Sequence, residues 1–150
     1  MRTKVILAAR VLLGLVFFVF GLNGFLHFLP QPPMSGPPAE FAGALIGSGY
    51  MFPLIKGTEV VCSVLLLSGR FVPLALTVLA PVIVNIVAFH SFLAPSGLAI
   101  PVVVVLLEVF LARSYWSAFS GILRAHALPD PSRSVLEARA RVEHDGALAR

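Results

Sequence analysis

The sequence predicts an all-α polytopic membrane protein, a bundle of four transmembrane helices with a short extra helix in the first external loop. Of its 150 residues, 58% are hydrophobic and only 12% are charged, whereas soluble domains are about 45–50% apolar and about 25% charged. No Asp, Glu, Lys or Arg occurs from Phe71 to Leu107. One small core cannot bury this many apolar side chains, which excludes an ordinary soluble domain.

Four apolar stretches approach the length of about 20 residues that a helix needs to cross a bilayer. They cover residues 5–26, 52–68, 71–92 and 98–116. The first stretch follows Arg2 and Lys4 as a signal peptide would, but Arg10 interrupts it and no small-x-small cleavage site follows, so we expect it to remain as an anchor. Residues 1–123 are therefore assigned to a four-helix transmembrane domain.

The connection after the first span is rich in proline and glycine, and its sequence HFLPQPPMSGPP cannot form a regular helix. The next segment, AEFAGALIGSGY, has helix-forming residues after a Pro-Pro pair and a stop that begins at Gly47. We expect a short helix there, on or in the outer face of the membrane. Pro81 falls in the middle of the third span, which predicts a kink between Thr77 and Pro81.

Lys and Arg beside the spans fix the predicted orientation. Arg70 lies between the second and third spans, and Arg113 and Arg124 follow the fourth, whereas connections 27–50 and 91–97 carry no Lys or Arg. Because basic residues stay in cytoplasmic loops, both termini should be cytoplasmic. We expect a multi-pass protein of a bacterial-type cytoplasmic (inner) membrane.

Residues 124–150 form a polar tail of mixed charge. We expect this tail to be cytoplasmic and partly disordered, with a short helix opened by a capping box at Ser134 and Glu137. A helix that docks on a partner or on the membrane surface is the alternative.

Composition also excludes several function classes. The single cysteine, Cys62, cannot form an internal disulfide, which excludes relays that need paired thiols in one chain. The eleven Lys and Arg residues are spread singly without a basic patch or an aromatic RNA-binding motif, so we expect no nucleic-acid partner.

Polar side chains within the spans are the candidate functional residues, because an ionisable group there costs about 3 kcal/mol and usually faces the bundle interior. Those predicted in the outer half are Asn23, His27, Lys56, Glu59, Asn85 and His90. Lys56 and Glu59 are three residues apart and can form a salt bridge on one helix face, which Cys62 continues. If these faces converge, they form a small polar pocket open to the outside. The alternative is that the Asn side chains bond between helices and the His side chains anchor at the interface.

Arg10 and Glu108 fall in the inner half at similar depth and have opposite charges, so we predict a structural ion pair between the first and fourth helices. Gly14, Gly21 and Gly24 would let a neighbouring backbone approach the first helix.

Two cofactor hypotheses follow from the histidines. His27 and His90 lie at similar predicted depth on different helices, as axial ligands of a haem would, although lone histidines near an interface are common without a cofactor. Glu59 would add only a third metal ligand without close spacing, so no metal site is predicted.

Two strings, ARVLLGLVFFVFGLNGF and GYMFPLIKGTEVVCSVLLLSGRFVPLAL, resemble the DoxX and DoxX-like family of small four-helix membrane proteins over about Arg10 to Leu123. The residues that match the family pattern are Arg10, Gly14, Gly21, Asn23, Glu59, Gly69 and Arg70. Many members carry a Lys after the Asn of the first span, where this chain has Gly24 and carries its Lys at position 56 instead. Some relatives are membrane subunits of thiosulfate:quinone oxidoreductase or belong to membrane redox assemblies that handle oxidative stress.

The resemblance implies a membrane protein associated with a redox or quinone-linked process. The outer pocket would hold a quinone head group or a small sulfur or organic substrate, with Lys56 and His90 supplying hydrogen bonds or protons and Glu59 orienting Lys56. The alternative is a non-enzymatic binding or assembly protein whose polar residues only specify helix packing. Expected partners are the lipid bilayer and either other membrane redox subunits or further copies of the chain.

Overall fold

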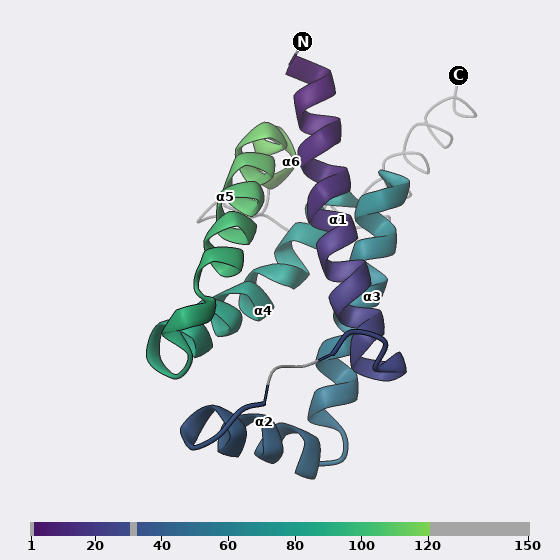
Figure 1. Ribbon diagram of the computed structural model, residues 1–150. Coiled ribbons are helices and arrows are strands. Elements are labelled where there is room, and N and C mark those ends of the chain that lie inside the picture. Colours follow the sequence, from purple (N-terminus) through teal and green to yellow (C-terminus); the bar gives the residue numbers. More distant parts are fainter. Residues whose placement is uncertain (1, 31–32, 121–150) are drawn as a thin grey trace, which may run out of the picture. The chain divides into compact units, whose positions relative to one another are not determined.

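A computed structural model describes residues 2–30 and 33–120 as helices joined by short connections (Figure 1). The helices in chain order are α1 (Arg2–Leu26), α2 (Pro37–Gly47), α3 (Met51–Ser68), α4 (Val72–Phe92), the 3₁₀ helix η1 (Pro95–Gly97), α5 (Ala99–Ser114) and α6 (Trp116–Phe119). The described residues contain no strand, which confirms the all-helical prediction. The predicted tail and its capping box lie outside them.

Glycines and prolines set several helix ends as the sequence suggested. The expected short helix of the first loop is α2, which begins at Pro37 and ends at Gly47. Helix α3 ends at Ser68 and is capped by Gly69, whose φ of 73° is left-handed. The Gly69 N–H donates to the Leu66 carbonyl and the Arg70 N–H to the Leu65 carbonyl, the bonds of a Schellman motif. This turn reverses the chain between α3 and α4 within three residues.

Helix α4 continues through Pro81, which lies inside it. Proline has no N–H to donate to the carbonyl one turn earlier, which favours a bend at this point. The kink between Thr77 and Pro81 stays a prediction.

The four long helices contact one another in a ring. Helix α1 packs most extensively on α3, α3 packs on α4, α4 on α5, and α5 returns to α1. The centre of the ring is filled by leucines that are fully or almost fully buried: Leu13, Leu66, Leu76, Leu79 and Leu111. These apolar contacts hold the helices that carry the polar residues in a fixed arrangement.

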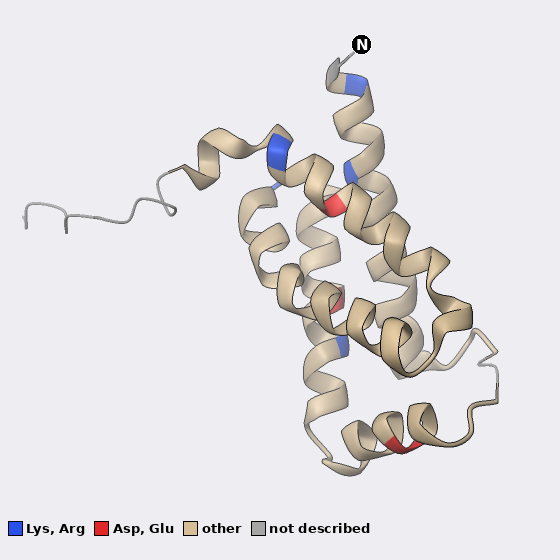
Figure 2. Ribbon diagram, turned by 90° about the vertical axis from the view of Figure 1, so that its left-hand side faces the viewer, with Lys and Arg blue, Asp and Glu red and all other residues tan. Residues whose placement is uncertain are grey.

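Three of these helices are long and apolar enough to cross a membrane, over Thr3–Leu26, Met51–Ser68 and Val72–Phe92. Helix α5 has 16 residues, which at about 1.5 Å per residue falls short of the bilayer's hydrocarbon core. Large apolar side chains such as Phe92 and Leu106 point outward, and charged positions are sparse along the helices (Figure 2). This surface requires contact with lipid.

Candidate functional site

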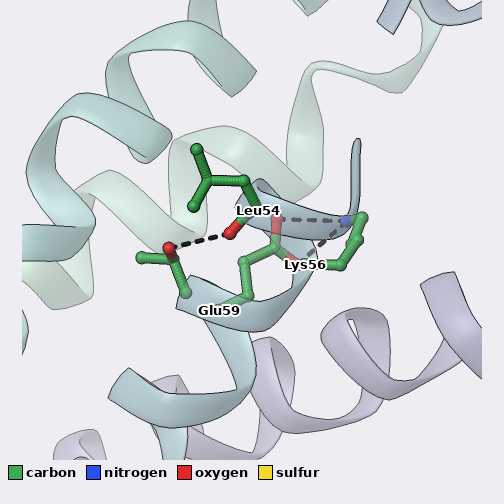
Figure 3. A network of polar contacts seen from close by, with 4 residues as sticks. Leu54, Lys56 and Glu59 are labelled. Carbon is green, nitrogen blue, oxygen red and sulfur yellow. Dashed lines mark hydrogen bonds and ion pairs between the residues drawn. The ribbon is translucent and has the colours of Figure 1, made fainter. Parts of the chain in front are cut away.

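The best-defined polar contact is the predicted ion pair on α3. Lys56 Nζ lies 2.9 Å from Oε2 and 3.1 Å from Oε1 of Glu59, and Figure 3 shows the ammonium reaching across one turn to both oxygens. The Glu59 side chain is 3% exposed and that of Lys56 is 20% exposed. A carboxylate buried this deeply needs a charged partner, and Lys56 provides it.

Helix α1 approaches this pair closely because it has glycines where it crosses α3. A Cβ added at Gly24 would lie 2.5 Å from Cγ of Lys56, and one added at Gly21 would lie 3.1 Å from Cβ of Glu59. Carbon atoms pack at about 3.5–4.0 Å, so a side chain at position 24 would collide with the lysine stem. The two glycines therefore allow α1 to lie directly against the ion pair.

The pair lines a cavity of about 400 Å³ between α2, α3 and α4, which we call the outer cavity. Its polar lining residues are Lys56, Glu59, Asn85 and His90, and its aromatic ones are Phe41, Phe52 and Phe89. The structure thus brings together four of the six residues that the sequence placed in one pocket. The remaining lining residues are aliphatic apart from Pro81, so the cavity joins a few polar groups to an apolar wall.

Aromatic rings from three helices line the outer cavity. Phe41 of α2 lies against Phe89 of α4, with ring centroids 5.6 Å apart, and Phe89 meets the edge of the His90 ring at 5.1 Å. On α3, Lys56 Nζ lies 5.9 Å from the centre of the Phe52 ring, within cation–π range. These rings offer aromatic surfaces on which a flat ligand can stack.

His90 is held in a defined orientation. Its Nδ1 lies 2.8 Å from the Ile86 carbonyl, one turn earlier on α4. Because a carbonyl only accepts hydrogen bonds, Nδ1 carries the proton, and in the neutral ring Nε2 is then an acceptor. Gly97 of η1 makes room for the ring, since a Cβ there would lie 2.7 Å from Cδ2 of His90.

The two polar residues of α1 lie elsewhere. Asn23 is 4% exposed, and its Oδ1 accepts a hydrogen bond of 2.6 Å from the Leu29 N–H. It therefore fixes the chain that leaves α1. His27 is exposed with a left-handed φ of 51°, and it does not line the outer cavity. The two candidate haem ligands, His27 and His90, thus do not share that cavity, and no group of three metal-ligating side chains occurs in the described residues.

Asn85, unlike Asn23, lacks a hydrogen-bond partner among the described residues. It lies on an exposed face of α4, lines the outer cavity and makes no hydrogen bond to any other described residue. Transfer of an amide from water to an apolar environment without a compensating hydrogen bond costs on the order of several kcal/mol. An unsatisfied amide at membrane depth is therefore unfavourable. A bound molecule with polar atoms would satisfy it.

The predicted ion pair between Arg10 and Glu108 is not formed. The one ion pair within residues 2–30 and 33–120 is Lys56–Glu59, while Arg10 Nε and Glu108 Oε2 are buried without a hydrogen-bond partner there. The guanidinium lies instead against Gly69, where any Cβ would collide with it. Arg10 thus packs on the end of α3, which a count of helix depth alone could not reveal.

The aromatic lining was missed by the sequence reasoning. Phe41 belongs to the short helix, Phe52 stands one turn before Lys56, and Phe89 is next to His90. Their positions beside predicted polar residues are a signal that could have singled them out. In a chain with twelve phenylalanines, that signal is weak.

Comparison with known proteins agrees with this architecture. The family model described as DoxX matches residues 5–118, which include nearly all of the described helical residues. No curated protein and no solved structure matches the chain. Because the family match covers most of the sequence, the chain belongs to the DoxX family.

Proposed function

We propose that the outer cavity binds the head group of a quinone or a similar flat ring with oxygen substituents, in a redox process of the membrane. The observation that carries this proposal is the convergence of Lys56, Asn85 and His90 with three phenylalanine side chains around one cavity of about 400 Å³. This volume lies within the roughly 300–1,000 Å³ of small-molecule sites.

The polar groups of the cavity match the two redox forms of such a ring. A lysine ammonium has three donors, and Lys56 directs contacts to both Glu59 oxygens, which leaves one donor for a ligand. The Asn85 amide can donate to a quinone oxygen or accept from a hydroquinone hydroxyl, and Nε2 of His90 can accept from the latter. Glu59 then acts as a positioning residue for Lys56.

In this proposal the chain crosses a bacterial-type inner membrane four times, with α5 as the fourth span and both termini cytoplasmic. Arg70 and Arg113, at the ends of α3 and α5, then lie on the cytoplasmic side. Helix α2 and the outer cavity lie on the external side, where membrane-soluble ligands reach the cavity from the lipid. Other redox subunits or further copies of the chain are the proposed partners.

One observation favours the alternative of a binding or assembly protein. Asn23 Oδ1 and both oxygens of Glu59 have hydrogen-bond partners within the chain, as groups that only specify helix packing would. In that case Glu59→Gln should lower thermal stability without altering the response to any ligand.

Calorimetric titration of the purified protein in lipid nanodiscs with a short-chain benzoquinone tests the proposal. We expect saturable binding that Asn85→Leu and His90→Phe weaken, because each removes a hydrogen-bonding group from the cavity. Thr58→Val is the matched control, since the Thr58 hydroxyl donates to the Leu54 carbonyl and Thr58 does not line the outer cavity. Wild-type protein that binds no more quinone than empty nanodiscs contradicts the proposal.

A further inference from the structure

A second cavity lies inside the ring of helices. This inner cavity has a volume of about 220 Å³ and is lined by residues of all four long helices. Lys56, Glu59, Ile86 and His90 line it and also line the outer cavity. The ion pair and the imidazole therefore form a polar partition between the ligand cavity and the bundle interior.

A second buried acid continues this polar path towards the end of the bundle where α1 begins. Val104 of α5 lines the inner cavity, and Glu108 follows it by one turn, about 6 Å along the axis. Val104 and Leu111 are buried on either side of Glu108, so all three share the inward stripe of α5. The Oε2 atom of Glu108 is buried and has no partner among the described residues.

Each of the four long helices carries a charged or titratable group with buried atoms or at the inner cavity. Helix α1 contributes Arg10, whose Nε is also buried without a partner in the described part of the chain. Helix α3 contributes Lys56, Glu59 and, one turn further along the helix, Cys62, which is 3% exposed. Helix α4 contributes His90, and α5 contributes Glu108. Orphaned polar atoms of this kind are satisfied in other proteins by buried water.

We propose that this column conducts protons between the outer cavity and the opposite end of the bundle, by way of Glu59, water in the inner cavity and Glu108. A cavity of about 220 Å³ has room for several waters, and Lys56, Glu59 and His90 in its otherwise apolar lining offer the polar partners that they need. Intramembrane acid and histidine chains are the usual elements of proton relays.

The passage of one proton along the whole path leaves the protein unchanged. A proton enters at the outer cavity onto the Glu59 carboxylate or Nε2 of His90 and passes through water to the Glu108 carboxylate. It leaves to water at the end of the bundle where α1 begins, and each group returns to its starting state. No electron is transferred, and conduction needs no ligand in the outer cavity, so this activity is separable from quinone binding.

Proton flux into quinone-free proteoliposomes measures the activity directly, with a pH dye inside and a potassium diffusion potential as the driving force. We expect wild-type flux clearly above that of protein-free liposomes. Glu108→Gln should lower the flux to the protein-free rate, whereas Glu40→Gln, an exposed acid on α2, should leave it at the wild-type value.

A second variant tests the route without removing a charge. Val16→Phe places a larger side chain in the inner cavity, which Val16 lines, and should also lower the flux. Monodisperse elution and helical content establish that each variant is folded. Wild-type flux no greater than that of empty liposomes, or flux in folded Glu108→Gln or Val16→Phe equal to that of the wild type, overturns the proposal. Quinone titration of the same proteins shows independently whether the outer cavity binds its ligand.

Discussion

Replacing Gly24 with alanine tests the contact between α1 and the ion pair. A Cβ at this position would lie 2.5 Å from Cγ and 2.6 Å from Cδ of Lys56, whereas carbons pack at about 3.5–4.0 Å, so the lysine stem must move by about 1 Å. Lys56 Nζ lies 2.9 Å from Oε2 of Glu59, so a shift of this size moves it out of hydrogen-bond range. We expect a loss of about 1–3 kcal/mol in the free energy of unfolding, the usual cost of overpacking.

Thermal and denaturant unfolding in detergent, followed by circular dichroism, measures this loss. Gly57→Ala on α3 is the matched control, because a Cβ there meets no atom within 4 Å. It should be neutral or stabilise the helix by up to about 1 kcal/mol, since alanine is the better helix former.

A double-mutant cycle identifies the cause. In a Lys56→Ala background the colliding Cγ and Cδ are absent and only Cβ remains, 3.2 Å from the added Cβ, so Gly24→Ala should lose most of its cost. The reasoning is refuted if Gly24→Ala is as stable as Gly57→Ala in the native background, or if its cost persists without the Lys56 side chain.

Three further substitutions follow from the same structure. Glu59→Gln leaves the Lys56 ammonium without its carboxylate and should cost about 2 kcal/mol of unfolding free energy, the scale of a charged hydrogen bond; an unchanged melting curve would show the pair to be unimportant. Asn23→Ala leaves the Leu29 N–H without its acceptor and should cost about 1–3 kcal/mol in the same assay, whereas Ser48→Ala, at an exposed turn, should cost less. Gly69→Ala places a side chain at a φ of 73° and against Arg10, and should cost more than the roughly 1–2 kcal/mol of a left-handed residue; trimming the collision with Arg10→Ala should recover part of it.

Helix positions could be predicted from the sequence because they depend on local signals. Apolar runs, together with the helix boundaries at Pro37, Gly47 and Gly69, predicted helices close to those observed. The predicted fourth span, residues 98–116, is longer than α5, which ends at Ser114 and is not among the three helices long and apolar enough to cross a membrane.

The candidate site was only partly predictable, because depth along a helix does not determine which way a side chain points. The spacing of Lys56 and Glu59 sufficed for their ion pair, which involves one helix. The contact of Arg10 with Gly69 depends on how α1 crosses α3, and depth alone suggested Glu108 instead. The inner cavity arises from the packing of four helices and leaves no mark in any one segment.

Photolabelling with an azidoquinone in nanodiscs tests the central claim, that the outer cavity is a ligand site, most directly. We predict adducts concentrated on the peptides of α2, α3 and α4 that line the cavity, displaced by unlabelled quinone and reduced in Asn85→Leu. Labelling spread evenly over the lipid-facing helices, insensitive to both competitor and substitution, would contradict it.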